Sequence, residues 1–494
     1  MPRMADMRRG LLISLAGAAF SAAPAAAGEL RAYEDCPYYV IYSDLGVDAV
    51  REAVVRMTAM AEEYSRRTQG FGGKITRKLP FYLFSTTQAY QAAGGLPGSA
   101  GTFTGDKLMA VAGQTTSART WHVVQHEGFH QFARAVIRGN LPMWLNEGMA
   151  EYFGEGLFTG DLFVTGVIPP GRLARLKVQL EGPKLKPIRE IMTIDNRAWN
   201  SAISIANYDQ AWSMIHFLVN GDKGKYVGAL SRFVNDISSG VGYEAAWARS
   251  FGRDLDAFEK RWRAYWLELP DNPTAELYVK ADVATMTSYL ARCTARRQPI
   301  AGAEDIFKAA ESGPAPLSRE SYIPPALVKE AAARAPKVGT WTLETPAKKN
   351  PQLVCVSKGG TKFVGTFALD GVRVRWVSVT EVTEKEAATK PAQTKPTTAS
   401  PASRPTVATQ PTATTRPAPV APVQPPHSQK PGAKPAEGGG QVDPVQRALD
   451  LARAYQATGN LTQGRQVLQD ALAENPSSKY ADQAKKLLAE LKAP

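Results

Sequence analysis

The stretch from residue 384 to residue 442 limits how this chain can fold more than any other feature. It contains no Phe, Trp or Tyr and consists mainly of Pro, Thr, Ala and Gln. Such a segment cannot bury enough apolar surface to compensate for the entropy lost when its backbone is ordered. We therefore predict a disordered linker that is extended where its prolines cluster. The 494-residue chain is 44% hydrophobic, which is enough for several compact domains around this linker.

The N-terminus has the pattern of an export signal. Arg8 and Arg9 precede a short apolar run, which is followed by small residues up to Ala27. The apolar run is shorter than the ~20 residues that a membrane-spanning helix needs. We predict a cleaved signal peptide over residues 1–27 and export to the periplasm, the cell envelope or the extracellular space. No later segment reads as a transmembrane helix.

The formal charge of +13 is spread along the chain and is not gathered in a dense Lys/Arg block. This distribution predicts a solvated basic surface, and we expect no nucleic-acid partner. The cysteines are Cys36, Cys293 and Cys355, which can form at most one disulfide and therefore no disulfide framework. The sequence leaves their pairing open.

The first half of the chain changes from mixed to helical periodicity. Three β-prone runs surround a helical spacing of apolar residues, which predicts a small α/β subdomain over residues 28–116. The pattern is mainly helical over residues 117–270. The β-prone runs are residues 38–42, 79–85 and 108–112, and the helical spacing extends from Val50 to Tyr64.

Two further parts are expected before the linker. Residues 271–337 have the pattern of short helices. Residues 338–383 predict a small antiparallel β-module, because Asp370-Gly371 separates two β-prone runs and Asp-Gly is a favoured hairpin turn.

The C-terminal residues 443–494 are helical in pattern and resemble one tetratricopeptide unit followed by a further helix. One such unit cannot bury its apolar face alone, so we expect it to bind a protein partner or to self-associate. A marginally stable helical hairpin is the alternative. The residues that carry the resemblance are Leu451, Ala452, Tyr455, Gly459, Asn460, Leu461, Leu468, Ala471, Asn475 and Pro476, whereas Gly464 departs from the usual alanine.

The segment His126-Glu127-Gly-Phe-His130 carries the clearest chemical signal in the chain. His126 and His130 are four residues apart, so on a helix they lie on one face, one turn apart. Two imidazoles in this position can hold one metal cation. Glu127 lies beside them and can take a proton from a bound water.

A catalytic zinc site needs a third protein ligand and leaves its fourth position to water. Glu147 and Glu151 follow in a second predicted helix that begins near Pro142 and share one face of it. Glu147 can therefore ligate the metal, while Glu151 can hydrogen-bond a ligating histidine and fix its tautomer. The alternative for each glutamate is a surface carboxylate.

At these residues the sequence resembles the gluzincin metallopeptidases, the superfamily of thermolysin and aminopeptidase N. That group pairs His-Glu-x-x-His with a glutamate ligand on a following helix, often in the context Leu-Asn-Glu-Gly, which here is Leu145–Gly148. The likeness covers residues 37–268 and is strongest to a branch of bacterial exported gluzincin-like domains. It implies an α+β fold, in which the small N-terminal α/β subdomain precedes a mainly helical, zincin-like catalytic subdomain.

The resemblance also assigns roles to the site residues. It implies one Zn²⁺ per chain, bound by His126, His130 and Glu147. Glu127 would be the general base. Glu151 matches the acid that orients a ligating histidine in the thermolysin pattern.

Two departures concern the type of peptidase. Sixteen residues separate His130 from Glu147, two fewer than in aminopeptidase N, and the Gly-x-Met-Glu-Asn segment that grips a free amino terminus is missing. Both favour an endopeptidase-like cleft.

Tyr208 lies 61 residues after Glu147, a distance at which aminopeptidase-like gluzincins place a tyrosine that stabilises the oxyanion. The alternative is a tyrosine that packs at the start of a helix. We expect His122 and His216 to be structural, and His427 lies in the predicted linker.

The sequence thus predicts an exported zinc metallopeptidase that hydrolyses peptide or protein substrates with a Glu127-activated water. The resemblance also implies that residues 108–112 form the strand edge along which an extended peptide lies. The alternative is a strand with no ligand role. The alternative function is a cell-envelope scaffold with a structural zinc domain and a tail that recruits partners.

Overall fold

The structure is a computed structural model that describes most of the chain before residue 383 and parts of the tail. The predicted signal peptide and the predicted linker lie outside the described residues. Those residues are 30–96, 99–112, 118–137, 139–201, 204–312, 322–382, 445–446, 448–449, 452, 465, 468–469, 471–472 and 475–491.

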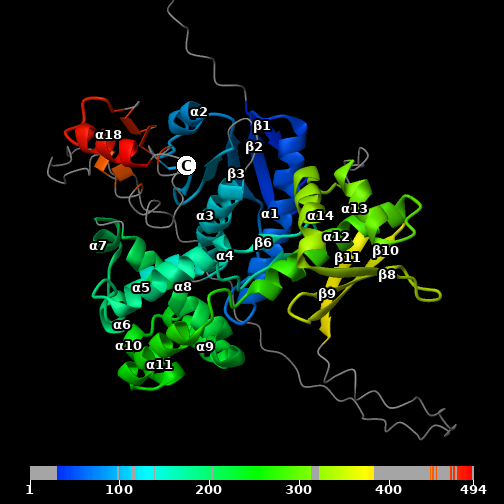
Figure 1. The fold of residues 1–494 in the computed structure, drawn as a ribbon. Coiled ribbons are helices and arrows are strands. Elements are labelled where there is room, and N and C mark those ends of the chain that lie inside the picture. The colour runs from blue at the N-terminus through cyan, green and yellow to red at the C-terminus, as the bar shows by residue number, and fades with distance from the viewer. Residues whose placement is uncertain are drawn as a thin grey trace, which may run out of the picture. The chain divides into compact units, whose positions relative to one another are not determined.

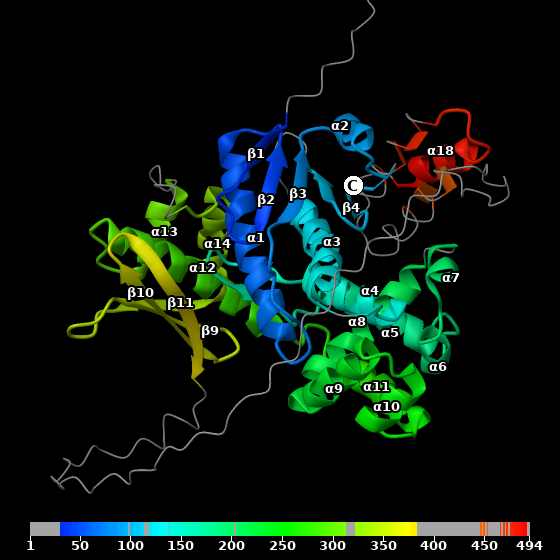
Figure 2. The ribbon, with the colours of Figure 1, turned by 180° about the vertical axis from the view of Figure 1, so that it is seen from behind.

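The chain has an α+β fold, as predicted, and is divided between Glu381 and Val382 into two compact units. The first unit holds all the predicted site residues and is shown from two sides in Figures 1 and 2. Among the described residues, no helix combines the length and the apolar composition that crossing a membrane requires.

The N-terminal layer is a five-stranded sheet in the order β1-β2-β3-β5-β4. The three inner strands are parallel, and β1 and β4 run antiparallel at the two edges. Helices α1 and α3 pack on one face and α2 packs on the other, so successive strand residues enter different cores. The elements are β1 (Arg31–Tyr33), β2 (Tyr39–Ser43), α1 (Val47–Thr68), β3 (Leu79–Phe84), α2 (Thr87–Ala92), β4 (Gly101–Phe103), β5 (Leu108–Val111) and α3 (Ala118–Val136).

The three predicted strands are confirmed as β2, β3 and β5, but one of their expected positions is wrong. Residues 108–112 do not form the sheet edge, because β5 lies between β3 and β4. The edge is β4, residues Gly101–Phe103. A strand of three residues is too short to show a period of two in the sequence.

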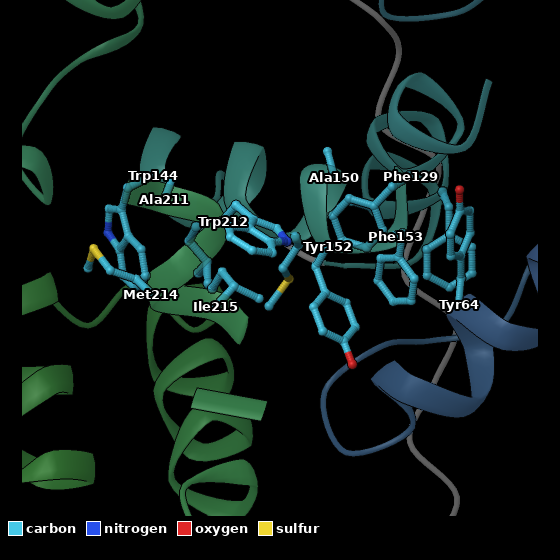
Figure 3. Close-up of a cluster of buried hydrophobic side chains, with 14 of the residues drawn as sticks. Tyr64, Phe129, Trp144, Ala150, Tyr152, Phe153, Ala211, Trp212, Met214 and Ile215 are labelled. Carbon is cyan, nitrogen blue, oxygen red and sulfur yellow. The ribbon is translucent and has the colours of Figure 1, made fainter. Parts of the chain in front are cut away.

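A helical layer continues from the sheet, and α4 lies in its centre, packed against both α3 and α8. Figure 3 shows the buried aromatic side chains that fill this region, from Trp144 and Trp212 to Phe153 and Tyr64. The elements are α4 (Met143–Gly154), β6 (Leu157–Phe158), β7 (Phe163–Val164), α5 (Pro170–Glu181), α6 (Ile188–Ile191), α7 (Asn196–Ser201), α8 (Ile205–Asn220), η1 (Gly221–Gly224), α9 (Val227–Ser238), α10 (Tyr243–Phe251) and α11 (Leu255–Glu268).

The antiparallel β-module is confirmed as a four-stranded sheet in the order β11-β10-β9-β8. The expectation of short helices before it is wrong, because α12 has 21 residues and packs across this sheet. Gly365 permits the close approach, since a Cβ there would lie 1.9 Å from Thr287 Oγ1. The elements are α12 (Ala275–Ala295), α13 (Ala303–Glu311), α14 (Pro325–Val338), β8 (Gly339–Glu344), β9 (Gln352–Ser357), β10 (Lys362–Asp370) and β11 (Arg373–Val382).

All three cysteines of the chain are buried and free, so none is paired in a disulfide. In the second unit, the predicted last helix is confirmed as α18 (Ala481–Glu490). Its apolar face packs in a small core with Val445, Leu449 and Leu468.

Candidate metal centre

The end of α3 and the start of α4 bring the two predicted motifs face to face. Gly139 follows α3 with φ +74°, a left-handed conformation that glycine adopts without strain. Pro142 then precedes the first residue of α4. This short connection turns the chain so that α4 packs back against α3.

Gln125 holds the two helices in register beside the site. Its buried amide donates to the carbonyls of Phe153, Gly154 and Gly156 at 3.0, 3.1 and 3.0 Å, which satisfies groups at the C-terminal end of α4. The main-chain carbonyl of Gln125 accepts a hydrogen bond from the buried Tyr64 hydroxyl. The residue before His126 is therefore fixed on both its main chain and its side chain.

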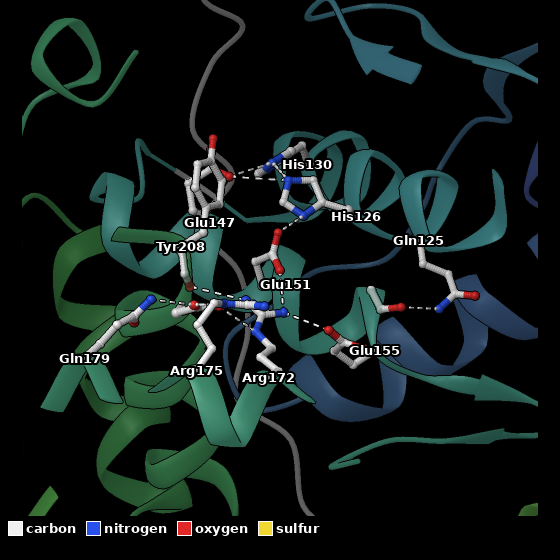
Figure 4. A network of polar contacts seen from close by, with 12 residues as sticks. Gln125, His126, His130, Glu147, Glu151, Glu155, Arg172, Arg175, Gln179 and Tyr208 are labelled. Atoms are coloured by element: carbon white, nitrogen blue, oxygen red, sulfur yellow. Dashed lines mark hydrogen bonds and ion pairs between the residues drawn. The ribbon is translucent and has the colours of Figure 1, made fainter. Parts of the chain in front are cut away.

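His126, His130 and Glu147 form a small triangle of potential ligand atoms (Figure 4). The two Nε2 atoms are 3.2 Å apart. Glu147 Oε2 lies 3.3 Å from Nε2 of His126 and 3.5 Å from Nε2 of His130.

This triangle fits a tetrahedral zinc ion. Ligand atoms about 2.0–2.1 Å from zinc lie about 3.3 Å from one another in a tetrahedron. Two imidazole nitrogens and one carboxylate oxygen are also a donor set that zinc accepts at catalytic sites. The three predicted ligands are therefore brought together with suitable spacing and chemistry.

The electrostatics of the triangle favour a positive charge. Burial alone would lower the pKa of His126, but hydrogen bonds to Glu147 and Glu151 raise it well above its ordinary value. Burial alone would raise the pKa of Glu147, yet the two histidines lower it to about 2. Without a metal the carboxylates hold a proton on His126, and a divalent cation would take its place.

Glu151 lies where the sequence predicts it, behind His126. His126 Nδ1 is 3.1 Å from Glu151 Oε1, so this nitrogen donates to the carboxylate and Nε2 points at the triangle. Among the described residues, by contrast, the buried Nδ1 of His130 has no hydrogen-bond partner. Within the described part of the chain, a side chain therefore binds the Nδ1 of His126 but not that of His130.

Glu127 stays outside the triangle and faces the edge strand. Its Oε2 accepts a hydrogen bond of 2.9 Å from the main-chain N–H of Phe103 in β4. The carboxylate is thus bound to the sheet edge through Oε2, and the described residues show no hydrogen bond to Oε1.

Tyr208 is in the first turn of α8 and joins the site. Its ring centre is 6.4 Å from that of His126 and 5.4 Å from that of Trp199. Figure 4 shows the ring beside Glu147, with the hydroxyl pointing toward the end where the imidazoles lie. Burial and the nearby Glu147 raise its pKa, so the phenol remains a hydrogen-bond donor at neutral pH.

The other histidines do not join the triangle. His216 is buried in the aromatic core, and its Nε2 donates to the Gly166 carbonyl at 3.0 Å. His122 lies one turn before His126 and faces Gly154. His427 lies outside the described residues.

The sequence reasoning missed Arg172, a buried arginine of α5 that binds Glu151 and Asp209. Asp209 also binds Arg175 and Gln179 from the same helix. Arg172, Arg175 and Gln179 are spaced by three and four residues and therefore share one face of α5. A helix face with two arginines usually predicts exposure to solvent, so no sequence pattern indicates a buried network here.

The family described as "Protein of unknown function (DUF1570)" matches residues 121–239. No curated protein and no solved structure matches the chain. The matched segment runs from within α3 to the end of α9 and contains His126, Glu127, His130, Glu147, Glu151, Arg172 and Tyr208, whereas Tyr64 and Phe103 precede it.

Proposed function

We propose that this protein is an exported zinc metallopeptidase of the gluzincin type that hydrolyses peptide or protein substrates. The triangle of His126, His130 and Glu147 carries the proposal, because its edges of 3.2, 3.3 and 3.5 Å match a tetrahedral zinc site. The N-terminal sequence supports export.

His126, His130 and Glu147 would hold the zinc. When bound, zinc supplies a Lewis acid that polarises the scissile carbonyl and lowers the pKa of a bound water toward ~7. Three protein ligands leave a position open, as a catalytic site requires and a structural site does not.

Glu127 would act as the general base and then as the general acid. Its Oε2 is held by the Phe103 N–H, so Oε1 takes the proton from the attacking water and returns it to the leaving amine. The same hydrogen bond ties the base to β4. An extended peptide that pairs with this edge strand would pass beside the base.

Tyr208 would supply the hydrogen-bond donor that stabilises the oxyanion. Its phenol donates to the oxygen of the scissile carbonyl as negative charge develops there. The raised pKa of Tyr208 keeps that proton in place at neutral pH.

The test compares Glu127→Gln with Glu147→Gln. Zinc-loaded wild type should cleave members of an unbiased peptide library, identified by mass spectrometry. Glu127→Gln should keep about one zinc per chain and lose hydrolysis by roughly 10²–10⁴, the usual contribution of a general base. Glu147→Gln should lose the zinc itself, because a neutral amide is a poorer ligand than a carboxylate.

Elemental analysis and cleavage rates separate the outcomes. Full hydrolysis by Glu127→Gln would show that Glu127 is not the base. A wild type that binds zinc and cleaves no library member would favour the scaffold function. Equal zinc in the wild type and in a variant with both His126→Ala and His130→Ala would remove the metal assignment altogether.

A further inference from the structure

Arg172 is a buried cation that the chemistry above does not use. Its side chain is 7% exposed and lies on α5, with the guanidinium 4.4 Å from the ring centre of Trp212. Nη1 donates to Glu151 Oε2 at 2.6 Å and to Glu155 Oε1 at 2.8 Å, and Nε donates to Asp209 Oδ1 at 3.1 Å. One planar group thus binds three carboxylates from two other segments.

These contacts reach both halves of the candidate site. Glu151 uses one oxygen for Arg172 and the other for His126 Nδ1, so the guanidinium is linked to His126 through two contacts. Asp209 directly follows Tyr208, whose carbonyl is 3.4 Å from Arg172 Nη2. Arg172 therefore links the segment that carries Glu151 to the segment that carries Tyr208.

Arg172 also explains a second group of potential ligands. His122, Glu151 and Glu155 bring one ligand atom each within 4.8 Å of one another. Arg172 Nη1 binds both of these carboxylates and already supplies the positive charge there. Both carboxylates are thereby neutralised by Arg172, and Glu151 keeps its second oxygen for His126 Nδ1.

We propose that Arg172 is a positioning residue for the metal centre, and that it acts through Glu151 on the orientation of His126. The inference rests on the proposed function, since it assumes that the triangle binds zinc. The planar fork of an arginine can hold Glu151, Glu155 and Asp209 at once, whereas a lysine ammonium is a point charge without that geometry. This chain of contacts fixes Nδ1 of His126, whereas Nδ1 of His130 has no hydrogen-bond partner among the described residues.

The experiment measures zinc affinity by competition with a chromophoric chelator, using the full chain. We expect Arg172→Lys and Arg172→Gln to weaken zinc binding by about 10–100-fold, the usual effect of losing a group that orients a ligand. Arg175→Lys is the matched control. Arg175 lies on the same helix and binds the same Asp209, but it has no contact with Glu151.

A double-mutant cycle separates positioning from general stability. If Arg172 acts through Glu151, the Arg172→Gln, Glu151→Gln double variant should bind zinc no more weakly than the weaker single variant. Losses of affinity that add would overturn the proposal, as would wild-type affinity in Arg172→Lys. Circular dichroism of each apo-protein identifies unfolded variants, and Arg172→Lys carries the test if Arg172→Gln does not fold.

The outcomes also distinguish this inference from the proposed function. If the wild type binds zinc and the Arg172 variants bind it equally well, the positioning role fails and the peptidase proposal stands. If the wild type binds zinc tightly, depends on Arg172 and cleaves no peptide, the peptidase proposal fails and the positioning role stands. A wild type that binds no zinc overturns both.

Discussion

Three glutamates within 25 positions show how contacts, and not residue type, assign roles at the residue scale. Glu147 faces two imidazoles, and its lowered pKa of about 2 suits a metal ligand. Glu151 is held between His126 and Arg172, so it orients its neighbour. Glu127 accepts a hydrogen bond from a main-chain N–H of the edge strand, and in the proposed function its other oxygen takes the proton.

Tyr208 allows a test of transition-state stabilisation alone. We expect Tyr208→Phe to keep its zinc and its packing against Trp199, and to lower kcat by about 10²–10³ with little change in KM. The reason is that only the hydroxyl donor to the developing oxyanion is lost. Steady-state rates on a library-derived peptide and elemental analysis provide the measurement. An unchanged kcat would assign Tyr208 to packing.

The burial of the neutral His216 imidazole leads us to expect that the folded protein loses stability in acid. Burial lowers its pKa to about 4, and protonating Nδ1 would place a charged donor where the described residues offer no acceptor. Unfolded chains take up this proton near pH 6.5, so the unfolded state binds more protons between pH 6.5 and 4. The contribution of neutral His216 to the free energy of unfolding is therefore fully present above pH 6.5. It falls by about 3 kcal/mol on acidification to pH 4.

Urea unfolding between pH 4 and 7 measures this effect. His216→Phe keeps an aromatic ring and loses the Gly166 hydrogen bond at every pH. The unfolding free energy of the wild type minus that of the variant should fall by about 3 kcal/mol between pH 6.5 and 4. A constant difference would contradict the lowered pKa.

At the scale of elements, the close packing of α4 against α8 sets where Tyr208 stands relative to the ligands. Gly148 lies at the contact, one residue after Glu147, and a Cβ there would be 2.5 Å from the Ala211 carbonyl oxygen. The neighbour is main chain and cannot rotate away. Helix packing thus requires a glycine directly after Glu147.

Gly148→Ala should destabilise the protein by about 1–3 kcal/mol, because the two helices must move apart. The same shift displaces Tyr208 and should lower hydrolysis while zinc stays bound. Gly171→Ala in α5 is the control, since a Cβ there meets no atom within 4 Å and should be neutral or slightly stabilising. Urea titrations measure the free energy of unfolding of both variants and of the wild type. Equal stability of Gly148→Ala and wild type would mean that α8 adapts at no cost.

At the scale of the whole molecule, the site belongs to a unit that ends at Glu381. Its helical and β-module parts pack through α12, whose residues contribute to the core shared with β9 and β10. The tail has its own small core around α18. Binding of a partner or self-association through residues 443–494 stays a prediction.

A chain truncated after Thr383 should therefore keep the unfolding midpoint and the zinc content of the full-length protein. All core residues around the site precede the cut, and the removed part includes the predicted linker. Thermal unfolding by circular dichroism and elemental analysis give the comparison. A lower midpoint in the truncated chain would show that the tail supports the first unit.

The sequence by itself determined what depends on local spacing. His126 and His130, and likewise Glu147 and Glu151, share helix faces because residues four apart always do so in an α-helix. The strands β2, β3 and β5 and the turn at Asp370-Gly371 follow from equally local patterns.

Only the tertiary structure decided which distant segments meet. The edge position of β4 depends on the order of the strands in the sheet. The hydrogen bond from Phe103 to Glu127 joins residues 24 positions apart, and the ion pair of Arg172 with Glu151 joins residues 21 positions apart. Such contacts arise from the packing of whole helices and sheets, which periodicity within one element does not specify. Local spacing thus predicts the metal ligands, whereas the groups that orient them come from the fold.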